Sequence, residues 1–110
     1  MSEILRFQKN LKKTINSQGF RFYNTIPNHP KYPYVILGSL KITPKTMIPP
    51  ISELEYCLKV ITQGHSKKLA FEIVEAIKPS IDHTLIKSVS SLEDGLINTI
   101  LLTYKGRIAT

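Results

Sequence analysis

The stretch Tyr32–Gly64 contains the two strand patterns that decide the fold. The first pattern, YVILG (residues 34–38), is apolar at consecutive positions, which predicts a central strand covered on both sides. The second pattern, SELEYCLKVIT (residues 52–62), alternates apolar and polar side chains, which is typical of a strand buried on one face. Together the two patterns predict half of a twisted antiparallel sheet.

The segment between these strands, Thr43–Pro50, is rich in proline and ends in an apolar tip at Met47 and Ile48. It has neither a helical nor a strand period, and its prolines cannot continue a ladder in the middle of a sheet. Two interpretations remain open. The segment is either a flap folded onto the sheet or an arm that reaches a neighbouring subunit, and we prefer the arm.

The alternating strand at residues 52–62 has two different faces. Its inner face is apolar and is predicted to build the core, with Leu54, Tyr56, Leu58 and Val60. Its outer face carries Glu53, Glu55, Cys57 and Lys59. We expect this outer face either to lie in water or to meet the basic half of another copy of the chain.

The remaining patterns predict one small domain, residues 1–110, of the α+β class. Helices are expected at residues 2–17 and 66–78, with Gly19 as the cap that ends the first. Strands are expected at residues 20–23, 34–40, 85–89 and 96–104, with a bulge or a close backbone approach at Gly38. Residues 90–95 read as a turn and residues 106–110 as a tail. The predicted architecture is an antiparallel sheet of about five strands with two helices packed on one face.

The net charge of +7 is concentrated in the first half of the chain. Eight basic residues and no Asp or Glu lie between Ile4 and Ser52. Four of the basic residues form the expected outer side of the first helix: Arg6, Lys9, Lys12 and Lys13. Such a face is either simply solvated or suited to an acidic partner or to nucleic acid.

No residue constellation in the sequence predicts catalysis, metal binding or a cofactor. The three histidines are far apart in the chain, and Cys57 is the single cysteine, so neither a zinc site nor an internal disulfide is expected. Glycines are scattered singly, without a phosphate-binding loop. We also expect no membrane span, because no apolar run is long enough, and no signal peptide.

The order of these parts resembles the small tail-completion, or tail-terminator, proteins of long-tailed phages and prophages. The resemblance rests on the motif YPYVILG (residues 32–38), the long strand that ends at Gly64, the helical motif Leu69–Ile77 and a final hairpin that ends in a basic residue, Arg107. It departs from the family at Ile61-Thr62, where a Trp-Ser pair is common, and in the Pro-rich segment Thr43–Pro50.

The resemblance implies a structural role without catalysis or cofactors. Members of the family form a ring, commonly a hexamer, that caps the tail tube, stops its polymerisation and meets the head connector. The implied partners are therefore other copies of the chain, the major tail tube protein and connector or neck proteins. The implied location is the virion tail, with assembly in the bacterial cytoplasm. The subunit or tube interface is expected at Lys45, Met47, Ile48, Ile51, Glu53, Glu55 and Phe71.

Two alternative functions stay open. One is another head-tail neck or joining protein, and the other is a small basic module that binds nucleic acid. The second is less favoured, because the aromatic residues are not interleaved with arginine as in a stacking platform. No membrane partner is expected.

Overall fold

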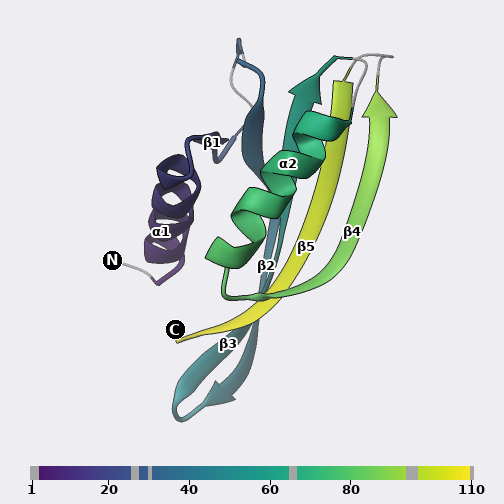
Figure 1. Cartoon of the computed structure of the whole chain (residues 1–110). Helices are drawn as coiled ribbons and strands as arrows, with labels where there is room; N and C mark the ends of the chain where they lie inside the picture. Colours follow the sequence, from purple (N-terminus) through teal and green to yellow (C-terminus); the bar gives the residue numbers. More distant parts are fainter. Residues whose placement is uncertain (1–2, 26–27, 30, 65–66, 94–96, 110) are drawn as a thin grey trace.

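The fold is a five-stranded mixed sheet with two helices on one of its faces (Figure 1). The computed structural model describes residues 3–25, 28–29, 31–64, 67–93 and 97–109. The strand order is β1-β2-β3-β5-β4. In chain order the elements are α1 (Glu3–Ser17), β1 (Arg21–Tyr23), β2 (Tyr34–Met47), β3 (Pro50–Gln63), α2 (Lys68–Ile77), the 3-10 turn η1 (Lys78–Ser80), β4 (Thr84–Glu93) and β5 (Ile97–Ala109). The α+β class and the two helices on one face are confirmed.

The sheet is not purely antiparallel, because the edge strand β1 runs parallel to β2. Arg21 pairs with Tyr34 and Tyr23 with Ile36. A tight hairpin forces two strands to be antiparallel, whereas the ten residues between Tyr23 and Tyr34 allow the chain to return before it pairs. The other three strand pairs are antiparallel, as expected.

Three strands extend well beyond their predicted ends. Strand β2 was expected to end at Leu40 but continues to Met47, so that the segment Thr43–Pro50 forms the end of a hairpin with β3. Pro44 is tolerated there because β1 covers only the first residues of β2, which leaves the rest as a sheet edge. Residues 106–109, expected as a tail, pair with β3. Strand β4 continues to Glu93, through residues expected to form a turn.

Two predicted glycine positions are confirmed. The register of β2 against β3 shifts between Leu37 and Leu40, around Gly38. Gly19 has a φ of 90° and follows α1 in a Schellman arrangement, in which the Gly19 amide donates to the Asn16 carbonyl and the Phe20 amide donates to the Ile15 carbonyl. Ser2 and Ser66, where the two helices were expected to begin, and Asp94-Gly95, in the expected turn, lie outside the described residues.

Both helices and one face of the sheet build a single core. Leu11 and Ile15 come from α1, and α2 buries Ala70, Ile73, Val74 and Ile77. They pack on the predicted inner face of β3 and on Ile100, Leu102 and Tyr104 of β5. Leu69, also on α2, is 42% exposed, because it lies at the margin of the buried face. All four residues 34–37 of β2 are buried, as predicted.

Candidate interaction surface

The most exposed apolar side chains of the described residues lie at the tip of the hairpin formed by β2 and β3. We call the outer part of this hairpin, residues 41–55, the arm, and Met47 and Ile48 its tip. Met47 is 86% and Ile48 94% exposed. The tip is ordered by pairing of Met47 with Pro50 and by a 2.6 Å hydrogen bond from the Thr46 hydroxyl to the Pro49 carbonyl. The arm projects from one end of a molecule that measures 51 × 25 × 24 Å (Figure 1). It is therefore an extended, ordered arm, and it does not fold onto the sheet as a flap.

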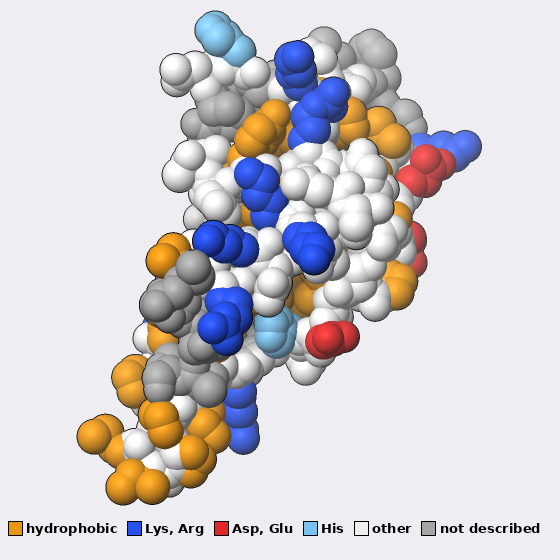
Figure 2. All heavy atoms as spheres, turned by 90° about the vertical axis from the view of Figure 1, so that its left-hand side faces the viewer, with side chains coloured by type: hydrophobic (Ala, Val, Ile, Leu, Met, Phe, Trp, Pro, Cys, Tyr) orange, Lys and Arg blue, Asp and Glu red, His pale blue; other side chains and the backbone are white. Residues whose placement is uncertain are grey.

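The apolar tip forms one end of the face that also bears α1. Figure 2 shows hydrophobic side chains gathered at the lower end of the molecule, with Lys and Arg side chains spread above them. An exposed apolar group favours association with another surface. Because this group is already held rigidly, little further conformational entropy is lost when it binds. The arm tip is thus the strongest candidate contact on this molecule.

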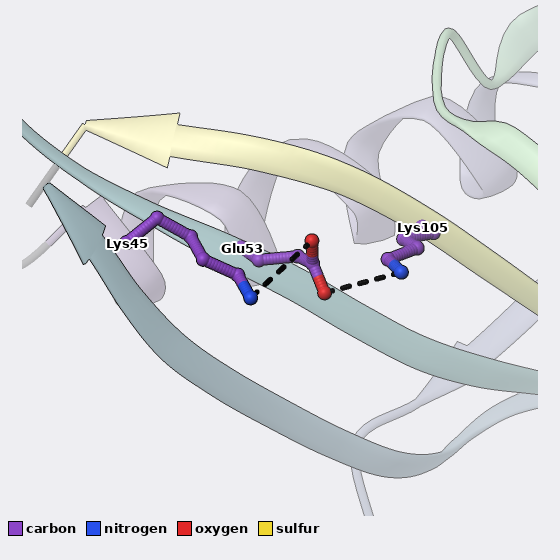
Figure 3. A network of polar contacts seen from close by, with 3 residues as sticks. All are labelled: Lys45, Glu53 and Lys105. Atoms are coloured by element: carbon purple, nitrogen blue, oxygen red, sulfur yellow. Dashed lines mark ion pairs between the residues drawn. The ribbon is translucent and has the colours of Figure 1, made fainter.

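The outer face of the arm is less acidic than its sequence indicates. Glu53 lies between two lysines, with its carboxylate 3.2 Å from the Lys105 amine on β5 and 4.0 Å from the Lys45 amine on β2 (Figure 3). Glu55 pairs in register with Lys41 and Lys105. The sequence left open whether this face lies in water or meets the basic half of another copy. Cross-strand lysines offset part of its negative charge within the chain.

The other predicted interface residues lie in two places. Ile51 is partly buried on the arm, beside Thr46 and Ala109 in the ladder. Phe71 lies on α2 and is 49% exposed, as its place on the polar side of that helix predicted. Because α2 packs on the body of the sheet, Phe71 belongs to a surface separate from the arm tip.

The predicted basic face of α1 is exposed in the structure. Arg6, Lys9, Lys12 and Lys13 are all exposed, while Leu11 and Ile15 on the other side of the helix are buried. This separation follows from the helical period, which places the two sets on different sides. The face can attract an acidic surface or phosphate groups.

A cleft that the sequence did not predict opens between α1 and the link from η1 to β4. It has a volume of about 310 Å³. Its apolar lining consists of Phe7, Leu11, Leu54, Tyr56, Ile81 and Ile108, and its polar lining of Asn10, Thr14, Ser80, Asp82, His83 and Arg107. These residues come from four separate stretches of the chain, which is why no local sequence motif predicts the cleft.

An aromatic cluster fixes one wall of this cleft. The Tyr56 hydroxyl lies 2.7 Å from Nδ1 of His83, and the Phe7 ring packs edge-on against Tyr56 at 4.8 Å between ring centroids. Tyr104 stacks beneath Tyr56 at 5.5 Å. Burial, and to a lesser degree the neighbouring Tyr104, raises the pKa of Tyr56. The hydroxyl therefore stays neutral and the cluster acts as a fixed wall.

The adjacent pair Asp82-His83 has no catalytic arrangement around it. His83 is occupied by Tyr56 and lies against Gly106, where a side chain would run into its ring. Within the described part of the chain no group of three or more His, Cys, Asp or Glu residues is placed to hold a metal ion. No helix among these residues is long and apolar enough to cross a membrane.

Three tyrosines gather on the outer face of the sheet, beside β1. Tyr34 has the rings of Tyr23 and Tyr32 each 5.5 Å away. Tyr32 and Tyr34 border a hollow of about 610 Å³ that Lys59 also lines. Tyr34 is buried, and its ring contacts are edge-on or tilted. This group is accordingly packed against itself instead of presenting open ring faces in a row.

Comparison with known proteins finds a similar fold in a virus-like particle. The chain superposes on a protein chain of a solved structure described as the virion of a native gene transfer agent particle, with a TM-score of 0.65 and 16% sequence identity. The match covers 91% of this chain and 95% of the other. No protein-family model and no curated protein sequence matches. At this identity the likeness shows the shared fold.

Proposed function

We propose that this chain is a non-enzymatic structural protein of a phage, a prophage or a phage-derived particle. In this proposal it forms a ring on the end of the tail tube, ends tube polymerisation and joins the tail to the head connector. The observation that carries the proposal is the fold shared over 91% of the chain with a protein of a gene transfer agent virion. The order of sequence motifs, which resembles tail terminators, supports the same role.

The arm supplies the means of assembly. Met47 and Ile48 at its tip contact the neighbouring subunit or the tube, because two apolar side chains held this far from their own core are stabilised only by a partner. Ile51 and Lys45 extend this contact along the arm. Phe71 forms a second, smaller contact from α2. Glu53 and Glu55 line the outer face of the arm beside lysines of the neighbouring strands. They therefore hold the strands of the arm in place more than they attract a basic partner surface.

The basic face of α1 attracts an acidic surface of a partner protein. Because Glu53 is already neutralised by Lys45 and Lys105, the strand face of a neighbouring copy is a poor match for it. The tail tube protein and the connector or neck proteins are the partners we assign to this face. The assembled protein lies in the virion tail, and its subunits assemble in the cytoplasm of the host bacterium.

The ring proposal is tested by measuring the mass and shape of the purified protein. Light scattering and negative-stain electron microscopy are applied to the protein alone and mixed with the tail tube protein encoded beside it. We expect closed rings, with six subunits as the expected number, either free or on tube ends. A protein that stays monomeric at high concentration, also with tube protein present, would rule the proposal out.

A second function is favoured by one observation, the exposed basic face of α1. It is binding of nucleic acid through phosphate contacts, which needs no motif beyond clustered lysine and arginine. The buried and mutually packed tyrosines beside β1 argue against base stacking as a further contribution.

The other alternative function is that of a different head-tail joining protein with the same fold. Such a protein would bind the head connector and not the tail tube, and this distinguishes it from a tail terminator.

A further inference from the structure

We infer that the cleft between α1 and the η1–β4 link receives the arm tip of a second copy of this chain. The inference rests on the proposed ring and names the contact that builds it. The residues that line the cleft pack against one another, and the proposed ring has not yet assigned them a contact. The tip has two apolar side chains with no partner in its own chain to cover them, at 86% and 94% exposure.

The cleft suits an apolar side chain next to polar backbone, because its lining is both apolar and polar. Leu54, Tyr56 and Ile108 line it from the sheet, and Phe7 and Ile81 line it from two other elements. Its volume of about 310 Å³ lies at the lower end of the range of about 300–1,000 Å³ typical of binding pockets. That size is suited to a hairpin tip with two side chains, and too small for a helix.

The tip and the cleft are both prepared before they meet. The Thr46 hydroxyl closes the tip on the Pro49 carbonyl, and the Tyr56–His83 hydrogen bond holds one cleft wall. Two rigid surfaces lose little conformational entropy on association, so that most of the apolar burial appears as affinity. Charge does not oppose the contact, because Asp82 and Arg107 both line the cleft and balance each other, and Lys45 of the arm is paired with Glu53.

The tip cannot enter the cleft of its own chain. The cleft residue nearest the tip along the ladder is Ile108, which pairs with Ser52, four positions after Ile48, and Leu54 follows two positions later. At about 3.3 Å per residue, the tip therefore lies roughly 13 Å from the near edge of its own cleft and roughly 20 Å from Leu54. The arm is paired out to Met47 and Pro50, so folding it back would break its ladder (Figure 1). The occupant is consequently another copy.

The contact is heterologous, because the donor and the acceptor are different surfaces of the chain. Each copy gives one tip and receives one, and a rotation that closes produces a ring in which every tip and every cleft is used. This geometry explains why a protein with such an exposed tip does not need a second kind of partner to bury it.

The test is site-specific cross-linking in a Cys57→Ser background, which removes the only natural thiol. One variant carries Ile48→Cys at the tip and a second carries Asn10→Cys on the exposed cleft rim. The two proteins are mixed, assembled and oxidised with copper phenanthroline. We expect a covalent dimer in the mixture and no covalent dimer from either variant alone. The matched control replaces Asn10→Cys by Ser90→Cys, an exposed position on β4, and gives no dimer.

A second measurement keeps the inference separate from the ring itself. The double variant Met47→Ser/Ile48→Ser should weaken assembly at least about tenfold and leave the thermal midpoint unchanged. Leu92→Ser, which removes another exposed apolar group (53% exposed) from β4, should leave assembly intact. The inference is overturned, while the ring proposal stands, by any of three results. These are tip-to-tip dimers of the Ile48→Cys variant, a dimer with the Ser90→Cys variant, or rings that give no cross-link at the tip. A protein that remains monomeric with tube protein overturns both.

Discussion

At the scale of single residues, two stacked tyrosines differ in what their hydroxyl groups contact. The Tyr56 hydroxyl has His83 as a partner at 2.7 Å. The Tyr104 hydroxyl is buried and has no hydrogen-bond partner among the described residues. Loss of a satisfied hydrogen bond lowers stability, whereas removal of an unsatisfied buried hydroxyl relieves its desolvation cost.

We therefore expect Tyr56→Phe to lower the free energy of unfolding by about 1 kcal/mol. Tyr104→Phe, the matched control in the same stack, should leave it unchanged or raise it. The measurement is urea denaturation at neutral pH. Equal losses for the two variants would mean that the Tyr56–His83 hydrogen bond adds nothing to stability.

Alkaline pH supplies an independent readout from the same two variants. Burial raises the pKa of both Tyr56 and Tyr104, so the folded protein keeps phenol protons that the unfolded chain releases from about pH 10 upward. Because the unfolded state then binds fewer protons, the free energy of unfolding falls as pH rises above about 10. Tyr56→Phe should make this fall less steep, as measured by thermal unfolding between neutral and alkaline pH.

At the scale of secondary-structure elements, the link from η1 to β4 is held against β5 by one close approach. The His83 ring lies over Gly106, and a Cβ added there would overlap the ring. Gly106 pairs with Leu54 in the ladder, so the backbone at this position has no freedom to withdraw. Position 106 therefore carries glycine because a larger side chain would not fit beside the His83 ring, and not because the backbone conformation requires glycine.

Gly106→Ala should destabilise the fold by about 1–3 kcal/mol, the usual cost of overpacking. The measurement is chemical denaturation in a double-mutant cycle with His83→Ala. Removal of the ring makes room for the methyl group, so the cost of Gly106→Ala should nearly vanish in the His83→Ala background. Additive losses would show that the added methyl group strains something other than the imidazole.

At the scale of the whole molecule, charge and apolar surface lie on separate parts. Exposed lysine and arginine cover α1, while the most exposed apolar groups sit on the arm tip (Figure 2). An assembly that uses the arm for self-contact leaves the basic face available for a different partner. This arrangement gives the two proposed functions different consequences for one set of variants.

The triple variant Lys9→Gln/Lys12→Gln/Lys13→Gln should keep the ring mass and lose affinity for an acidic tube or connector protein. We expect no retention of double-stranded DNA by the natural chain at about 0.15 M salt. A nucleic-acid module would instead bind DNA with an affinity that falls steeply as salt rises. In the triple variant the slope of log affinity against log salt concentration would be smaller, by the amount expected for about three lost phosphate contacts. Fluorescence anisotropy across a salt series separates the two results.

The local features of this protein could be predicted from its sequence alone. The alternation at residues 52–62 predicted which side chains of β3 enter the core, because a strand has a period of two. The helical period separated the basic side of α1 from its buried side, and Gly19 and Gly38 marked a cap and a bulge that the structure contains. Each of these signals lies within one short window of the chain.

How these short segments pair with one another is visible only in the folded chain. The parallel alignment of β1, the continuation of β2 to Met47 through the Pro-rich segment, and the lysines beside Glu53 all depend on neighbouring strands. The cleft combines Phe7 with His83 for the same reason. Pairing register and charge neutralisation arise between residues far apart in the chain, so no local period records them.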